Sequence, residues 1–456
     1  MPDETRQLAE FVHSVGVSPL PADVIDYLCW YQLDNLACGF LGSRQPWFRT
    51  IVRALAPRGG APLAHTFGHA ERVGVSPAAL VNGAAISAFE IEHAYGGAHP
   101  GAVVLSAVLA LGESLHASGE HVLRALAAGY EVNLRVGSSH GHGAEAERGF
   151  HNPALSGVFG AAAGCSVLLG LTPDQIVSAF GIAASHACGL IAFVWSGAET
   201  KRLHLGRSAQ LGLESALLAA EGFMGPPEAI EGRYGYLAAY TPTPRPERLC
   251  SGLGTDWRLF NVSVKAHPAH GAVQPFIAPL DALRAEGVRA ADVTSLTVLG
   301  SPDAGEDRHL DRAPATVLGA QYSVPFLVAR VLAHGAEGLL TLDDAGLRDE
   351  TVRQLAERVQ VVTRPGETGR TINDGGEVTV ELPSGTITRE APGLAGLDRD
   401  RLAELCVRKF ESYTAFALDH AERERAREVV ATLGDLGDIS ELGEILARAT
   451  TAASRG

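Results

Sequence analysis

The chain is poor in cysteine and has no cysteine pair at a metal-binding or redox spacing. Its 456 residues include 6 cysteines: Cys29, Cys38, Cys165, Cys188, Cys250 and Cys406. No two of them form a C-x-x-C motif. We therefore expect buried, reduced thiols, which are typical of a cytoplasmic protein.

Long apolar runs and an excess of basic residues are also missing. Glycine, serine or histidine interrupts every window of about 18 residues that could otherwise span a bilayer, and the first residues, MPDETRQLAEF, lack the basic and apolar regions of a signal peptide. With 37 Lys and Arg against 52 Asp and Glu, the formal charge is −15. This charge argues against nucleic acid or an anionic membrane as a partner. We expect a cytoplasmic protein that acts on a small molecule.

A complete metal-binding motif is missing as well. His65 and His69 have the i,i+4 spacing of two metal ligands on a helix, but no glutamate of the HExxH type accompanies them. We therefore expect no metal site.

The residue pattern predicts a mainly α protein with a large helical domain and a smaller α+β domain. Residues 1–262 form successive apolar segments of helical character, and the chain is long enough for a large core. Residues 263–395 contain β-branched, partly alternating segments with helical stretches between them, which is typical of an α+β domain. The charged helical tail, residues 396–456, is expected to pack back on the first domain and complete it.

Proline and glycine locate the ends of individual elements. One helix is expected from Pro21 to Gly42, a second over residues 77–95, and a third from Pro100. In the α+β domain, strands are expected at residues 293–300, 357–364 and 376–390, with helices at 316–335 and 343–357.

Small residues recur at spacings of three and four in two of the expected helices. They are Gly157, Gly160 and Gly164 in one, and Gly206, Ala209, Gly212 and Ala216 in the other. Glycine inside a helix costs about 1 kcal/mol relative to alanine. The stripes therefore predict a compensating close approach of helix backbones.

Titratable side chains are expected near the starts of the same two helices. Asn152 suits the N-cap and Pro153 the first helical position, so His151 is expected beside free backbone N–H groups, where carboxylate ligands bind. Lys201 and His204 are three residues apart and share one helix face. The pattern predicts a pocket for a small di- or tricarboxylate, with groups that can move a proton.

Several segments together resemble the MmgE/PrpD family, which includes 2-methylcitrate dehydratase, cis-aconitate decarboxylase and iminodisuccinate epimerase. In chain order they are AALVNGAAISAFEIEHAYGGAHPG, AAGYEVNLRVG, GFHNPALSGVFGAAAG, GIAASHACGL, TKRLHLGRSAQLGL, GFMGPPEAIEG, LGTDWRL, KAHPAHGAVQPFI and AQYSVPFLVA. The resemblance covers most of the chain. It implies an all-helical domain completed by the C-terminal tail, a smaller α+β lid domain, a homodimer, and a site between the domains that uses no cofactor.

The chain departs from the family pattern before its His-Pro pair at His99. The family usually reads NGxxxHxxDFDDTH there, whereas this chain has Ser87 where a histidine is common and offers Glu90 or Glu92 as the acidic residues. The lid segment SPDAGEDRHL also lacks the tyrosine found in decarboxylase members. These changes alter the acidic arm and one wall of the implied pocket.

The resemblance implies a proton-transfer pair and a cation. We predict His99 and His151 as the pair, with the choice of base between them open, because a neutral imidazole can take a proton from carbon. Lys201 is predicted to bind a substrate carboxylate and stabilise the enolate-like charge that develops.

Four further residues have predicted roles. Glu90 is expected either to orient a histidine or to cap its own helix. His204 is expected either to bind substrate or to hydrogen-bond across the helix packing. Lys265 and His270 are predicted contacts of the substrate carboxylates.

These residues predict a cofactor-independent lyase that abstracts an α-proton and removes water from a β-hydroxy di- or tricarboxylate. The alternative is an epimerase or isomerase of a substituted dicarboxylate, because proton exchange remains feasible with the altered acidic arm. Decarboxylation and a non-catalytic binding or scaffold role are further alternatives.

Overall fold

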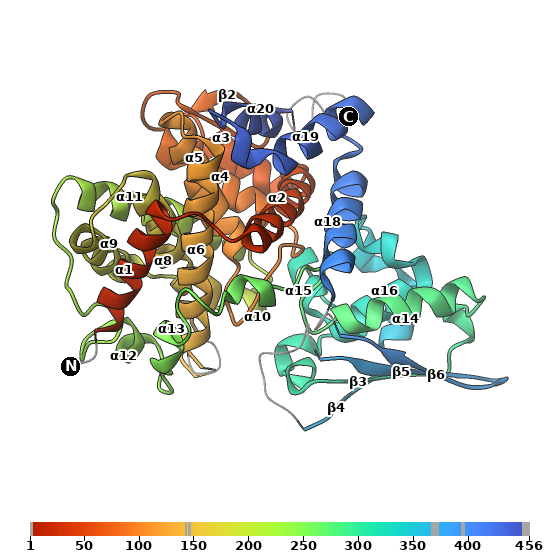
Figure 1. Cartoon of the computed structure of the whole chain (residues 1–456). Helices are drawn as coiled ribbons and strands as arrows, with labels where there is room; N and C mark the ends of the chain where they lie inside the picture. Colours follow the sequence, from red (N-terminus) through yellow and green to blue (C-terminus); the bar gives the residue numbers. More distant parts are fainter. Residues whose placement is uncertain (1–2, 142–143, 145–146, 366–373, 394–396, 449–456) are drawn as a thin grey trace. The chain divides into compact units, whose positions relative to one another are not determined.

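The computed structural model describes residues 3–141, 144, 147–365, 374–393 and 397–448 (Figure 1). The chain divides into two compact units: residues 1–191, 200–262 and 400–456 make the helical unit, and residues 192–199 and 263–399 make the α+β unit. Helices dominate and the sheets are small, so the mainly α fold class is confirmed. None of the described helices is long and apolar enough to cross a membrane.

The described helices of the helical unit are held together by a central helix, α8, in which every residue is buried. It packs against α6 and α11, and α11 packs in turn against α4. The helices are α1 (Glu4–Val17), α2 (Ala22–Ser43), α3 (Pro46–Leu55), α4 (Val75–Ile86), the π-helical turn η1 (Gly101–Leu105), α5 (Ser106–Ser114), α6 (Gly119–Ser139), α8 (Asn152–Leu168), α9 (Pro173–His186), α11 (Thr200–Ala220), α12 (Tyr236–Tyr240), α13 (Glu247–Cys250), the 3₁₀ turns η2 (Arg258–Asn261) and η8 (Leu433–Asp435), α18 (Arg399–Thr414, of which Arg399 belongs to the α+β unit), α19 (His420–Ala431) and α20 (Ser440–Ala447).

The predicted small-residue stripes lie where backbones touch. A Cβ atom on Gly160 would lie 2.9 Å from the carbonyl oxygen of Gly129 in α6, and one on Gly206 would lie 2.1 Å from the carbonyl oxygen of Leu80 in α4. Only glycine leaves room for these approaches, so the predicted close helix packing is confirmed.

Replacing Gly206 by alanine is therefore expected to destabilise the fold by about 1–3 kcal/mol, because the added methyl group clashes with backbone. Alanine is otherwise about 1 kcal/mol better than glycine inside a helix, so any net loss reports the clash. Urea denaturation measures it. Gly437→Ala, where a Cβ meets nothing within 4 Å, is the control. Equal midpoints for the two variants would contradict the packing account.

The expected helix over residues 77–95 is wrong in its second half. Helix α4 ends at Ile86, the Ser87 hydroxyl donates to the carbonyl of Gly83 at 2.8 Å, and Glu90 has a left-handed φ of 59°. A left-handed residue cannot continue an α-helix. The chain instead reverses at a bridge between Tyr95 and Ala98, which leads directly into the predicted helix start at Pro100.

A short hairpin in the helical unit was not predicted. Strands β1 (Ala64–Thr66) and β2 (His69–Val73) pair in antiparallel register. His65 and His69 therefore lie in strands, so their i,i+4 spacing does not place them on one face of a helix. The His65 ring pairs with Glu113 of α5. A turn forms here instead of the helix that the spacing would suit, because Gly68 takes a left-handed φ of 67°.

The α+β unit is built on a four-stranded sheet with the order β4-β3-β5-β6. Strands β3 and β4 are parallel, and the other neighbours are antiparallel. Figure 1 shows α14 and α16 lying over the sheet. The elements are β3 (Ser295–Gly300), β4 (Val359–Thr363), β5 (Gly376–Leu382), β6 (Gly385–Ala391), α10 (Phe193–Ser196), α14 (Gln274–Ala285), α15 (Val317–Tyr322), α16 (Val324–His334), α17 (Glu350–Ala356), and the 3₁₀ turns η3 (Ala290–Asp292), η4 (Pro302–Gly305), η5 (Asp307–His309), η6 (Ala336–Leu339) and η7 (Gly346–Arg348).

The three predicted strand segments are confirmed, and the third forms the β5–β6 hairpin. The helix expected over residues 316–335 is divided into α15 and α16 at Ser323. Pro325 cannot donate its backbone nitrogen to a preceding turn and restricts the residue before it. Ser323 caps the new helix by accepting from the N–H of Phe326 at 3.0 Å.

Candidate active site

Helix α11 carries two of the predicted site residues at its start. Lys201 and His204 lie one helical turn apart on this helix, as expected. The Lys201 ammonium forms an ion pair with the carboxylate of Glu90, and their side chains are 4% and 0% exposed. A buried carboxylate needs such a partner because it has lost most of its contact with water.

Glu90 holds this position from a strained backbone. It has a positive φ and lies beyond the end of α4, so the prediction that it caps its own helix is wrong. Left-handed conformations of residues other than glycine cost on the order of 1–3 kcal/mol and persist where the surroundings impose them. Here an ion pair with Lys201 holds the carboxylate.

The second group is a pair of histidines from α8 and α11. The Nδ1 atoms of His151 and His204 are 3.2 Å apart. His151 is the N-cap and α8 begins at Asn152, one residue earlier than predicted, with Pro153 inside the first turn. One Nδ1 must donate and the other accept, so at least one imidazole is neutral and carries its proton on Nε2.

The surroundings of His204 favour its neutral form. Burial, with a smaller contribution from the nearby ammonium of Lys201, lowers the pKa of His204 to about 4. At neutral pH, His204 is therefore a neutral hydrogen-bonding partner of His151. It can accept a proton only when the positive charge that the proton brings is compensated.

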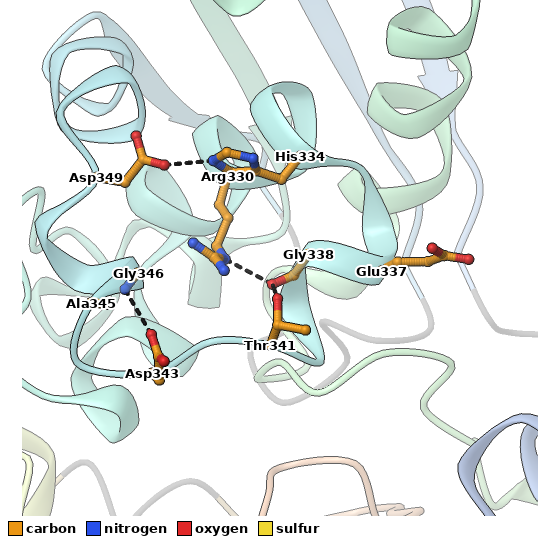
Figure 2. A pocket seen from close by; sticks show the side chains of 9 residues that line it. All are labelled: Arg330, His334, Glu337, Gly338, Thr341, Asp343, Ala345, Gly346 and Asp349. Carbon is orange, nitrogen blue, oxygen red and sulfur yellow. Dashed lines mark hydrogen bonds and ion pairs between the residues drawn. The ribbon is translucent and has the colours of Figure 1, made fainter. Parts of the chain in front are cut away.

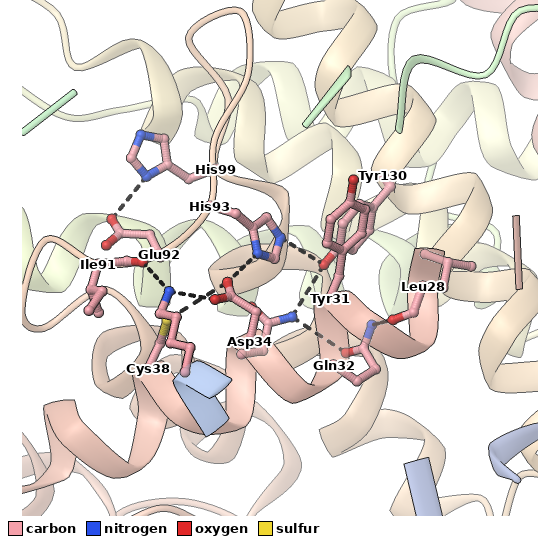
Figure 3. Close-up of polar contacts among 12 residues, drawn as sticks. Leu28, Tyr31, Gln32, Asp34, Cys38, Ile91, Glu92, His93, His99 and Tyr130 are labelled. Carbon is pink, nitrogen blue, oxygen red and sulfur yellow. Dashed lines mark hydrogen bonds and ion pairs between the residues drawn. The ribbon is translucent and has the colours of Figure 1, made fainter. Parts of the chain in front are cut away.

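The third group joins His99 to a carboxylate. Its Nδ1 is 2.9 Å from Oε1 of Glu92, with side chains 13% and 1% exposed (Figure 3). A carboxylate accepts hydrogen bonds, so Nδ1 of His99 carries a proton here. This arrangement fixes the imidazole and leaves Nε2 as the nitrogen that can exchange a proton with a ligand.

The structure thus pairs Glu92 with a histidine, His99, and pairs Glu90 with Lys201. From the sequence, both residues were candidates for the acidic arm, and Glu90 was expected either to orient a histidine or to cap its own helix. Both glutamates follow the same apolar segment, and nothing in the pattern signals the left-handed turn that directs Glu90 to Lys201.

The segments that carry these groups meet within the helical unit. A Cβ on Gly97, two residues before His99, would lie 2.4 Å from Nδ2 of Asn152, next to His151. A Cβ on Gly189 would lie 3.4 Å from Nδ1 of His204. The loop before His99 therefore contacts the start of α8 beside His151, and the backbone at Gly189 lies against the His204 ring.

Lys265 and His270 belong to the α+β unit. Lys265 is buried. The His270 ring packs against the rings of His309 at 4.4 Å and Tyr322 at 4.6 Å between centroids, and its Nδ1 accepts from the N–H of Ala272 at 3.3 Å. The tyrosine beside His270 is Tyr322 of α15, which lies outside the lid segment SPDAGEDRHL.

A separate cavity of about 510 Å³ lies in the α+β unit and shares no lining residue with the predicted site (Figure 2). Arg330 lines it and donates through Nε to the carbonyl of Gly338 at 2.8 Å, and His334 is held by Asp349 at 2.6 Å. As for metals, no three His, Cys, Asp or Glu side chains within the described ranges gather as a metal site would require.

Comparison with known proteins decides the family. The model of the MmgE/PrpD N-terminal domain matches residues 6–249, and the model of the MmgE/PrpD C-terminal domain matches residues 267–435. The chain belongs to the MmgE/PrpD family. The resemblance expected from the sequence is thereby confirmed.

Relatives of this MmgE/PrpD chain match it over almost its whole length. The cis-aconitate decarboxylase-like protein oryM of Aspergillus oryzae is 29% identical, with 96% of each chain covered. Cis-aconitate decarboxylase of Aspergillus terreus is 26% identical over 97% of this chain and 95% of its own. The human cis-aconitate decarboxylase is 28% identical over 97% and 94%. Family and relatives together indicate an enzyme of the lyase type.

Proposed function

We propose that the protein is a cofactor-independent lyase that removes water from a β-hydroxy di- or tricarboxylate after abstraction of the α-proton. One set of observations supports the proposal. The helical unit contains a buried ammonium, Lys201, close enough to His204 of the His151–His204 pair to lower its pKa, and a His99–Glu92 pair on a segment that contacts Asn152 beside His151. A cation for carboxylates and two proton-transfer groups are what this elimination needs.

The step balances without an added reagent. One imidazole, of His99 or His151, takes the proton from the carbon next to a carboxylate. The electron pair of that C–H bond becomes the new C=C bond as the C–O bond to the β-hydroxyl breaks. The other imidazole, protonated beforehand, gives its proton to the departing hydroxide, and water leaves. Lys201 stabilises the negative charge that develops on the carboxylate during the step.

The α+β unit supplies further groups for the same substrate in this proposal. Lys265 and His270 are proposed to contact substrate carboxylates, so their loss would raise KM more than it lowers kcat. A homodimer is also proposed, on the family resemblance alone.

Loss of carbon dioxide is the second candidate, and the names of the relatives favour it. Here the C–C bond to one carboxylate breaks, and the electron pair passes into the remaining unsaturated acid. A protonated imidazole then gives its proton to carbon. The same cation and one of the two imidazole groups serve this reaction, so the residues support both candidates.

An NMR assay in D₂O distinguishes the reactions. The protein is incubated with β-hydroxy acids related to citrate, with cis-aconitate, and with dicarboxylates derived from aspartate. We expect a new vinylic signal from a hydroxy acid. If carbon dioxide forms from cis-aconitate and the hydroxy acids give no vinylic signal, the proposed reaction is decarboxylation and not dehydration. Deuterium uptake with neither product would support an epimerase, and tight binding without reaction would support a scaffold.

A further inference from the structure

A buried polar network lies beside the His99–Glu92 pair and uses the C-terminal part of the chain. Asp34 of α2 is fully buried, and Lys409 of α18 donates to its Oδ1. The same ammonium donates to the carbonyl oxygen of Ile91 at 2.7 Å, and Nδ1 of His93 is 2.7 Å from Oδ2 of Asp34. Figure 3 shows these contacts converging on Asp34.

The charges in this network balance. Burial by itself would raise the pKa of Asp34, but the ammonium of Lys409 and the hydrogen bond from His93 outweigh burial and hold that pKa below its usual value. Burial would lower the pKa of Lys409, and Asp34 raises it instead. One carboxylate and one ammonium are therefore both charged and compensate each other.

His93 links Asp34 to two further polar side chains. The Tyr130 hydroxyl lies 3.1 Å from Nε2 of His93, and Nδ2 of Asn35 donates to the Tyr130 oxygen at 3.2 Å. Nδ1–H of His93 then donates to Asp34. Asp34, His93, Tyr130 and Asn35 are thus hydrogen-bonded in series, and a buried network of this kind restrains the side chains that it joins.

The network holds the backbone on both sides of Glu92. Lys409 fixes the carbonyl of Ile91, the residue before Glu92, and Asp34 fixes the ring of His93, the residue after it. The Glu92 carboxylate lies between these two anchors and accepts from His99. A shift of either anchor moves the carboxylate relative to the imidazole.

The network also supports the His99 side of the pair. Gly101 follows His99 by two residues and begins η1. A Cβ on Gly101 would lie 2.1 Å from Oδ1 of Asn35 and 2.5 Å from Cε1 of His93. The backbone after His99 therefore packs directly against side chains of the same network that holds the backbone around Glu92.

We propose that Asp34, His93 and Lys409 form a clamp that positions the carboxylate of Glu92 against Nδ1 of His99. The clamp acts through Glu92 and touches no substrate, so these three are positioning residues. Lys409 lies in α18, so the clamp gives this C-terminal helix an indirect role in catalysis. The catalytic consequence rests on the role proposed for His99; the structural consequence does not.

Nitrogen NMR of histidine tests the clamp directly. In protein labelled with ¹⁵N-histidine, the signals of His99 are assigned by their loss in His99→Gln. The wild type is expected to have His99 with its proton on Nδ1 only. Asp34→Asn and Lys409→Met are expected to give a mixture of both tautomers. With the acid that the wild type turns over, both variants are expected to lower kcat by about 100-fold with little change in KM, as misplacement by about 1 Å does.

Glu113→Gln is the matched control. Glu113 is another fully buried carboxylate of the helical unit with a histidine and a cation as partners, His65 and Arg72. This variant is expected to lose stability as Asp34→Asn does but to keep the His99 tautomer and kcat. If the clamp variants do not fold, Gly101→Ala decides, because it disturbs the contact while leaving every charge in place.

The outcomes separate the clamp from the proposed function. An unchanged His99 tautomer in the folded clamp variants, or an equal change in Glu113→Gln, overturns the clamp. A changed tautomer supports it even where His99→Gln retains full kcat, a result that contradicts only the proposed role of His99.

Discussion

Replacing Lys201 by methionine is expected to lower kcat/KM by about 1,000-fold. The variant loses the ammonium proposed to bind the substrate carboxylate and leaves Glu90 as a buried negative charge that would repel the same carboxylate. Loss of one preorganised donor for developing negative charge typically costs about 100- to 1,000-fold in kcat, and the repulsion adds to it. Steady-state kinetics on the acid identified by the D₂O assay measures the effect.

The double variant Lys201→Met/Glu90→Gln separates chemistry from folding. It removes the stranded charge, so its thermal stability should return toward that of the wild type while turnover stays low. Activity within ten-fold of the wild type in the single variant would remove Lys201 from the mechanism. Activity restored in the double variant would show that only the stranded charge had mattered.

Replacing His99 by glutamine is expected to lower kcat by roughly 100- to 10,000-fold, the range that a general acid or base contributes. Glutamine keeps a donor toward Glu92 but has no group that titrates near neutral pH. Glu92→Gln should have a smaller effect of the same kind, because the imidazole remains but loses the carboxylate that fixes its tautomer. The readout is kcat from progress curves at saturating substrate.

His65→Gln is the control for this series. His65 also pairs with a buried glutamate, Glu113, in the helical unit, but it lies in the β1–β2 hairpin and has no proposed role in the reaction. It should reduce stability and leave kcat unchanged. Equal losses of kcat in His65→Gln and His99→Gln would mean that both act through folding alone.

Local signals in the sequence were enough for much of the fold. Proline marks the starts of helices near residues 21, 100 and 153, because its missing N–H is tolerated only in the first turn. The stripes at Gly160 and Gly206 indicate backbone contacts, because the cost of glycine in a helix needs a compensating gain. The strands of the α+β unit follow from β-branched alternation.

The errors fall where distant residues decide local conformation. Residues 87–95 contain no glycine or proline and are compatible with a helix, yet an ion pair with Lys201, more than one hundred residues away, accompanies a left-handed turn at Glu90. Helical propensity is a weak preference that such contacts override. The hairpin at residues 64–73 was missed for a related reason, because its only local signal is a single glycine in the turn.

The site residues were predictable as types but not as pairs. Lys201 and His204 share a helix face by spacing alone. The pairing of His99 with Glu92, and of His204 with His151, depends on how distant segments pack. A single sequence does not contain that information. Lys409 is the extreme case, since 375 residues separate it from Asp34.

Proton exchange at the substrate carbon is the most direct test of imidazole catalysis on a carboxylate bound by Lys201. The acid that the wild type turns over is incubated in D₂O, and the deuterium content at the carbon next to its carboxylate is followed by NMR. We predict that the wild type exchanges or incorporates one deuterium there, and that His99→Gln and His151→Gln each slow this by at least about 100-fold. Incorporation at the wild-type rate in both variants would contradict the account.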